Sequence, residues 1–216
     1  HTETRKIKNA EEKTQKEEKP VILNIHGLES DGNNSKYRYL IEKGYKNVQS
    51  PTLDYKNQNT YNVFNRLCNC IELSVKQNPD EQITLIGSSL GGFFAYCLCV
   101  KYGVRTLLLN PSLMPFVTLR NNDYFSGTRL RPFIKLFGEY MREAEYYNFN
   151  AILSLNDEVI NHEELTLPIL GSKDSSNIYF VDSDHRMAVT EEIGELIEKL
   201  IAPSTMKLAD LLEDGI

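Results

Sequence analysis

Apolar residues in the body of the chain fall into short runs separated by more polar segments. Six runs of four to six residues predict β-strands, at residues 21–25, 47–52, 83–86, 104–109, 151–155 and 177–181. The second run is the weakest, because Pro51 interrupts it and has no backbone N–H to donate. Short, largely apolar runs of this kind are typical of strands buried in a parallel sheet.

Several of the segments between these runs carry helical patterns. Residues 59–76 place apolar side chains at positions 61, 64, 67, 68, 71 and 75, the period of a helix with one buried face. Further helices are expected at residues 93–101 and at about 189–201. Strands that alternate with helices predict doubly wound α/β architecture, a mostly parallel sheet with helices on both faces. Catalytic groups of such a fold belong at the carboxyl ends of its strands.

The two ends of the chain differ from this body. Residues 1–20 hold six basic and five acidic residues without an apolar stripe, and we interpret them as a charged, flexible leader. An arm that binds a partner is the alternative. Residues 21–202 contain no repeat or low-complexity linker and are interpreted as one domain. Residues 203–216, with leucines at 208, 211 and 212, are expected to form a C-terminal tail or a short amphipathic helix.

Composition excludes several classes of protein. Of the 216 residues, 41% are hydrophobic and 25% charged, which excludes wholesale disorder. The longest apolar run, residues 93–100, is far shorter than the roughly 18 residues of a membrane-spanning helix. The net charge of -6 argues against nucleic acid as the main partner. Four cysteines are too few for a disulfide scaffold, so we expect a reducing, cytoplasmic location.

The most informative motif is Gly87-Ser88-Ser89-Leu90-Gly91, which has the form G-x-S-x-G. It lies where a predicted strand ends and a predicted helix begins, the place where a sharp turn exposes a nucleophilic serine. Neighbours two positions away must be small in such a turn, and glycines stand two positions before and after Ser89. Ser89 is therefore the candidate nucleophile, and Ser88 is not. A glycine-rich turn or a phosphate-binding loop is the alternative reading.

A serine nucleophile needs a base, and the chain has four histidines. His1 lies in the leader, and His26 comes too early for the chain order serine, acid, histidine. His162 lies in a polar run and is expected to face solvent. His185 follows the last predicted strand, on a loop at a carboxyl end, and is the candidate base.

The acid that orients this base is expected just after the preceding strand. Asp157 is the first carboxylate beyond residues 151–155, and Glu158 is expected to point away from the site. Asp182 and Asp184 are the alternatives, but a residue so close to His185 rarely reaches its Nδ1 with good geometry. We also expect an oxyanion hole made by the backbone N–H groups of Leu90 and Leu28.

Together these stretches resemble the small YqiA/YcfP-type esterases of the α/β-hydrolase superfamily. The resemblance covers about residues 21–201 and is carried by Ile25-His26-Gly27-Leu28 with Ser30, Gly87-Ser88-Ser89-Leu90-Gly91-Gly92, Asn110-Pro111, Asp157-Glu158-Val159 and Asp184-His185. It implies a compact α/β-hydrolase fold without the superfamily's first two strands. It also implies hydrolysis of simple carboxylic esters or thioesters by a Ser89, Asp157, His185 triad. Members commonly have glycines before the catalytic histidine, where this chain has Asp182-Ser183-Asp184.

Two further features of the sequence are interpreted as structural rather than functional. Cys68 and Cys70, like Cys97 and Cys99, are two apart on predicted helices, so their side chains diverge and we interpret them as buried apolar residues rather than metal ligands. Residues 112–147 occupy the position of a lid and are rich in aromatic and basic residues. We read them as a helix packed on the sheet with a solvated basic face. An acyl pocket that meets an anionic thioester is the alternative.

The sequence therefore predicts a cytoplasmic serine hydrolase acting on small acyl esters or thioesters, without a cofactor or metal. An acyl-CoA thioesterase or amidase on the same triad is one alternative. A non-catalytic α/β-hydrolase scaffold that acts as a binding protein is the other.

Overall fold

A computed structural model describes residues 19–141 and 148–203 of the chain. Almost all of the charged leader and the C-terminal stretch after residue 203 lie outside the described residues, as does part of the lid-position segment. The predictions made for both ends of the chain therefore remain predictions.

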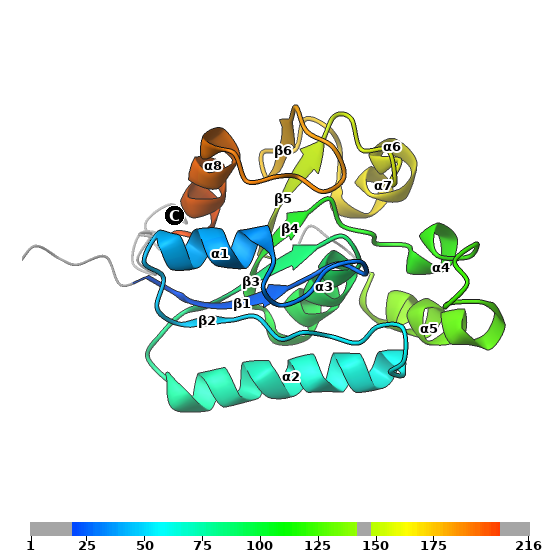
Figure 1. Cartoon of the computed structure of the whole chain (residues 1–216), viewed down its shortest axis with the longest axis horizontal. Coiled ribbons are helices and arrows are strands. Elements are labelled where there is room, and N and C mark those ends of the chain that lie inside the picture. The colour runs from blue at the N-terminus through cyan, green and yellow to red at the C-terminus, as the bar shows by residue number, and fades with distance from the viewer. Residues whose placement is uncertain (1–18, 142–147, 204–216) are drawn as a thin grey trace, which may run out of the picture.

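A six-stranded sheet forms the centre of the fold (Figure 1). All its neighbouring strands are parallel, in the order β2-β1-β3-β4-β5-β6. The strands are β1 (Val21–Ile25), β2 (Val48–Gln49), β3 (Ile83–Ser88), β4 (Arg105–Leu109), β5 (Phe149–Ser154) and β6 (Ile178–Val181). The predicted α/β class is confirmed, and the strand that was weakest in the sequence, β2, is also the shortest.

Helices cover both faces of this sheet (Figure 1). They are α1 (Ser35–Glu42), α2 (Thr60–Gln77), α3 (Leu90–Tyr102), α4 (Pro115–Thr118), α5 (Arg131–Tyr140), α6 (His162–Leu165), α7 (Leu167–Leu170) and α8 (Glu191–Ile201), with a 3₁₀ turn η1 (Gly127–Leu130) before α5. Helices α2, α3 and α5 belong to one core cluster, and α1 and α8 to the other.

Alternation along the strands divides the sheet's side chains between these two cores. On β1, Val21, Leu23 and Ile25 join the core under α2 and α3, whereas Ile22 joins the core under α1 and α8. Helix α3 is buried from Leu90 to Cys99, because the sheet lies on one side and α5 on another, and only its last turn reaches the surface. The strand ends are thereby fixed between two packed layers.

The structure differs from the sequence-based prediction at several helices. Helix α3 begins at Leu90, three residues before the predicted start. Gly91 and Gly92 have low helix propensity, so the sequence did not indicate a helix there. In the structure they allow α3 to pack closely against the end of β1 and Pro111. Helix α1 was not predicted. It has no clear apolar stripe, and its start depends on the Asn34 side chain, which accepts a hydrogen bond from the N–H of Tyr37 at 3.1 Å.

The segment in the lid position packs onto the rest of the domain. Phe125, Phe133 and Tyr140 are buried in the core, where Phe133 lies edge-on to Phe93 of α3 with a centroid separation of 5.6 Å. Arg131 on the same helix is exposed. The described part of this segment therefore packs mainly on α3 and α2 rather than on the sheet as predicted, with the basic side chains of Arg131 and Lys135 exposed on α5.

The cysteine side chains are free thiols. Cys68, Cys97 and Cys99 are buried and Cys70 is half-buried, in agreement with their reading as apolar residues. Among the residues that the structure describes, no three His, Cys, Asp or Glu side chains are grouped so that they could hold a metal ion. Within the same residues, every helix is too short or too polar to cross a membrane.

We predict that Gly91→Ala destabilises the fold by about 3 kcal/mol, because a Cβ there would lie 2.2 Å from the carbonyl oxygen of Ile25. Gly138→Ala is the matched control. It lies within α5 with nothing within 4 Å of a new Cβ, so it should stabilise by about 0.5–1 kcal/mol. Urea unfolding measures both. Equal stability of the two variants would contradict the close approach of β1 and α3.

Candidate active site

Ser89 lies at the turn between β3 and α3 in a strained conformation. Its φ of 52° and ψ of -119° are rare for a residue with a side chain and cost of order 1–3 kcal/mol. The turn is held in place by its neighbours. The Ser89 N–H donates to the carbonyl of Leu109 at 3.0 Å, and the N–H of Ser112 donates to the carbonyl of Ser89 at 2.9 Å. The end of β4 and the loop after it thus fix the backbone of the candidate nucleophile.

Four glycines allow the backbone to pass closely around this turn. A Cβ on Gly87 would lie 2.4 Å from the Cβ of Ala95, and one on Gly92 would lie 2.6 Å from the Cβ of Pro111. Gly91 contacts the end of β1, as described above. Gly27, in the loop after β1, would place a Cβ 3.1 Å from the Cβ of Ser89. Side chains at these positions would force the strand, the helix and the loop apart.

His185 lies on the loop between β6 and α8 and reaches back to the serine. Its Nε2 is 2.9 Å from Ser89 Oγ, and its Nδ1 is 3.0 and 2.9 Å from the two carboxylate oxygens of Asp157. A carboxylate only accepts hydrogen bonds, so Nδ1 carries the proton and Nε2 is free to accept one from the serine. The structure thus brings together three residues that follow three different strands.

Asp157 is held by four donors. Its Oδ1 accepts from the N–H groups of Val159 at 2.9 Å and Ile160 at 2.8 Å, and its Oδ2 is 2.9 Å from the Nε2 of His162. Burial of the side chain, 2% exposed, raises the pKa of Asp157, but the hydrogen bonds from His162, His185 and the backbone outweigh it and hold that pKa well below its ordinary value. The carboxylate is therefore ionised at neutral pH.

Two expectations about this region were wrong. His162 does not face solvent: it begins α6, is buried, and points at Asp157. The four-residue helix is too short for periodicity to reveal which side is buried. Glu158 does not point away from the site either, because its Oε2 accepts a hydrogen bond from the backbone N–H of His185 at 3.0 Å. It helps to hold the loop of the candidate base.

The alternative acids bind other groups. Asp182 Oδ1 accepts from the side-chain amide of Asn156 at 2.7 Å, and Asp184 Oδ1 accepts from the N–H of Met187 at 3.1 Å. The geometry therefore favours Asp157 as the carboxylate that faces the imidazole of His185.

His26 supports the loop that passes beside Ser89. It is buried, its Nδ1 lies 2.6 Å from the carbonyl of Gly27, and its Nε2 accepts from the N–H of Leu53 at 2.8 Å. Burial lowers the pKa of His26, which keeps the ring neutral as these two bonds require. The hydroxyl of Tyr55 donates to the carbonyl of His26 at 2.6 Å. These contacts fix Gly27 and Leu28 next to the nucleophile.

Asn110 connects the ends of three strands. Its Nδ2 donates to Ser154 Oγ at 2.8 Å and to the carbonyls of Asp184 and His185 at 3.1 Å, and its Oδ1 accepts from the N–H of Ser154 at 2.7 Å. Its φ of 43° is left-handed, a region that asparagine tolerates better than most residues. An Asn-Pro pair directly after a strand was the only sequence signal for this role.

Lys36 supports the loop that carries His185, and this role was not predicted from the sequence. It is buried on α1, and its Nζ donates to the carbonyl of Arg186 at 2.6 Å. Burial lowers the pKa of Lys36 to about 8, although the negative charge of Asp184 opposes this. A lysine between polar neighbours on a short helix gives no sign of burial in the sequence.

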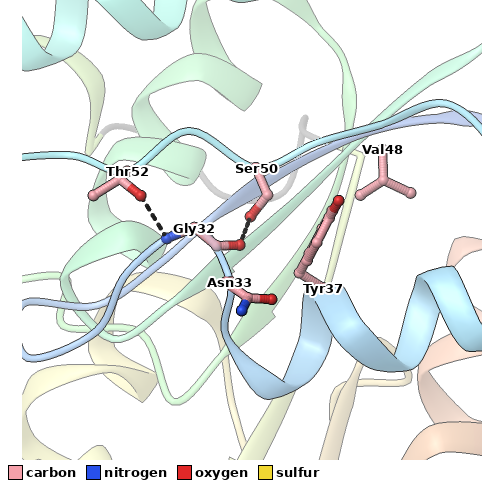
Figure 2. A pocket seen from close by; sticks show the side chains of 6 residues that line it. All are labelled: Gly32, Asn33, Tyr37, Val48, Ser50 and Thr52. Carbon is pink, nitrogen blue, oxygen red and sulfur yellow. Dashed lines mark hydrogen bonds between the residues drawn. The ribbon is translucent and has the colours of Figure 1, made fainter.

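Two hollows lie away from Ser89. One of about 280 Å³ lies between the loop after β1, α1 and β2, where Figure 2 shows Gly32 bonded to Thr52 and Ser50. Its polar groups bind one another and join these loops. A larger groove of about 790 Å³ is lined by Asp157 and His162 together with Leu155, Val159 and Phe180. Neither is lined by the candidate nucleophile, so the site is assigned from the chemistry of Ser89.

Sequence comparison places the chain in a family. The uncharacterised protein family UPF0227 matches residues 21–174. The chain belongs to this family. A UPF0227 protein of Shewanella sediminis (strain HAW-EB3) is 32% identical over 153 residues, which are 68% of this chain and 80% of the relative. The family resemblance inferred from the motifs is thereby confirmed.

Solved structures are similar in fold. Est1E from Butyrivibrio proteoclasticus has a TM-score of 0.62 and 14% identity, with 88% of this chain and 91% of Est1E covered. A structure from LipS and LipT, two metagenome-derived lipolytic enzymes, also has a TM-score of 0.62 and 14% identity, covering 84% of this chain and 91% of that one. The chain has the α/β-hydrolase fold.

We predict that Lys36→Met changes how stability depends on pH. The unfolded chain keeps Lys36 protonated up to about its ordinary pKa of 10.5, and the folded chain loses the proton near 8, so between these values the unfolded state binds more protons. Wild-type stability therefore gains up to about 3 kcal/mol from this residue as pH rises through the interval. The variant lacks this gain.

Denaturant unfolding of wild type and variant at pH 7.5 and pH 10 measures the effect, with exposed Lys46→Met as the matched control. The stability of Lys36→Met relative to wild type should fall as pH rises. An unchanged difference at the two pH values would contradict the burial of the ammonium group.

Proposed function

We propose that this protein is a serine hydrolase that cleaves small carboxylic esters or thioesters through an acyl-enzyme. Ser89 is the nucleophile, His185 the general base and acid, and Asp157 the carboxylate that orients the histidine. The observation that carries the proposal is the unbroken chain of hydrogen bonds from Ser89 Oγ through both ring nitrogens of His185 to Asp157.

The first half of the proposed reaction forms the acyl-enzyme. Ser89 Oγ attacks the carbonyl carbon of the ester while His185 Nε2 takes the hydroxyl proton. Asp157 stays ionised and stabilises the imidazolium. The tetrahedral intermediate then collapses, the bond to the leaving alcohol or thiol breaks, and His185 returns the proton to that group. In the second half, His185 takes a proton from water, which attacks the acyl carbon and forms a second tetrahedral intermediate. The bond from that carbon to Ser89 Oγ then breaks, His185 returns the proton to Oγ, and the carboxylic acid leaves.

The oxyanion of each tetrahedral intermediate needs donors beside Ser89. Leu90 is the first residue of α3, where backbone N–H groups have no partner within the helix and the helix dipole is positive. The loop that carries Gly27 and Leu28 passes beside the Ser89 side chain. We assign the backbone N–H groups of Leu28 and Leu90 to the oxyanion hole. Loss of one such donor typically costs about 10²–10³ in rate.

The similarity to lipolytic enzymes supports an ester substrate over a binding role. A binding scaffold would not require the strained Ser89, its contact with His185 or the buried carboxylate. A thioesterase or amidase on the same triad is the second candidate, and the exposed basic side chains of Arg120, Arg131 and Lys135 favour an anionic thioester among these. We place the reaction in the cytoplasm on the strength of the free thiols. The proposed steps require no metal or cofactor.

We predict that Ser89→Ala lowers hydrolysis of p-nitrophenyl acetate and butyrate to near the background rate, whereas the matched control Ser88→Ala retains most of it. Of these two serines, Ser89 is the one that bonds to His185 and has the strained backbone of a nucleophile at this turn. Initial rates, with circular dichroism to verify folding, test the pair. An active Ser89→Ala variant beside an inactive Ser88→Ala variant would show that the wrong serine was assigned.

We predict that Asp157→Asn lowers kcat by about 10⁴, because an amide in place of the carboxylate lets His185 adopt the wrong tautomer. Glu158→Gln is the control. Its Oε1 still accepts the backbone N–H of His185, so kcat should fall less than about tenfold. Steady-state kinetics at neutral pH compare the variants. If Asp184→Asn were crippled and Asp157→Asn active, the acid would be Asp184.

A further inference from the structure

We infer that His162 is a second histidine of the active site, a positioning residue that holds Asp157 toward His185. The inference rests on the proposed function, because it concerns the same carboxylate. Oδ2 of Asp157 is 2.9 Å from His162 Nε2 and 2.9 Å from His185 Nδ1. The carboxylate therefore lies between two imidazole rings, of which only that of His185 contacts the nucleophile among the described contacts.

The proton on His162 is located by its neighbours. Nε2 faces two acceptors, Asp157 Oδ2 at 2.9 Å and the side-chain oxygen of Asn110 at 3.2 Å. The orientation of the Asn110 amide is fixed, because its nitrogen donates to two backbone carbonyls and its oxygen accepts from the N–H of Ser154. Two acceptors at one ring nitrogen require that this nitrogen carries hydrogen. His162 therefore donates to Asp157.

The other ring nitrogen completes the arrangement. His162 Nδ1 lies 2.8 Å from Oγ1 of Thr166, one turn further along and fully buried. This hydrogen bond between His162 Nδ1 and the Thr166 hydroxyl fixes the plane of the ring. Thr166 thus orients His162 and His162 orients Asp157, which in turn orients His185.

Burial makes this donor hard to replace. The His162 side chain is 6% exposed and that of Asp157 is 2% exposed, so a ring without a donor at this position leaves a nearly buried carboxylate oxygen one hydrogen bond short. The backbone N–H groups of Val159 and Ile160 both bind the other oxygen, Oδ1. Oδ2 then has only His185 itself as donor among the described contacts, so the orientation of the carboxylate toward His185 depends on Oδ1 alone.

The test is a double-mutant cycle in kcat. His162→Phe keeps a ring of similar shape but has no donor, and it should lower kcat about ten- to a hundredfold with KM changed less than about threefold. In the Asp157→Asn background, where no carboxylate remains to be oriented, the same substitution should change kcat less than about twofold. His162→Gln, whose amide nitrogen can occupy the place of Nε2, should recover most of the loss.

Thr84→Val is the matched control for a buried polar-to-apolar change. Thr84 is fully buried on β3, and its hydroxyl has no hydrogen-bond partner among the described residues, so its variant should retain wild-type kcat. If His162→Phe does not fold, His162→Met, which also lacks a donor and repacks more readily, takes its place in the cycle.

The outcomes separate the inference from the proposed function. A Ser89→Ala variant as active as wild type would overturn the proposed function itself. An Asp157→Asn variant as active as wild type would overturn the assignment of Asp157 as the acid and, with it, the role of His162. A crippled Asp157→Asn together with a fully active His162→Phe would overturn only the role of His162. Equal fold losses from His162→Phe in both backgrounds, or no recovery with glutamine, would show that His162 acts through general stability rather than through Asp157.

Discussion

The site depends on the left-handed backbone of Ser89. A serine pays a conformational penalty at φ 52°, and the fold compensates with packing that tolerates almost no extra atoms. The end of β1 lies against Gly91, and Pro111 beyond β4 lies against Gly92. Backbone hydrogen bonds from both sides of Ser89 to the segment around β4 complete the constraint. Because close packing of the main chain fixes this turn, it also fixes the direction of the Ser89 side chain.

A hydrogen-bond network at the ends of β4, β5 and β6 holds the base His185 and the acid Asp157 beside Ser89. Asn110 after β4 binds Ser154 at the end of β5 and the carbonyls of the loop after β6. Glu158 and Lys36 bind the same loop through its backbone, at His185 and Arg186 respectively. Side chains from elsewhere in the chain thus hold the loop Asp182-Ser183-Asp184-His185 in position.

Much of the fold and part of the site could be predicted from the sequence, because the relevant information is local. Short apolar runs and the helical pattern of residues 59–76 define the sheet and α2, and the glycines around Ser89 mark the turn. His162 and Lys36 could not be placed. Their burial follows from the four-residue α6 and from α1, neither of which has an apolar stripe long enough to show its inner face. The bond from Glu158 to His185 joins residues 27 positions apart and leaves no local signal.

The central claim is that Ser89 is the group that forms a covalent bond with substrate. The most direct test is to incubate the protein with a fluorophosphonate, digest it and locate the adduct by peptide mass spectrometry. The account predicts one phosphonyl group per chain, on Ser89, with ester hydrolysis lost in proportion to labelling. Labelling of Ser88 or Ser112 instead, or ester hydrolysis that continues without any adduct on Ser89, would contradict it.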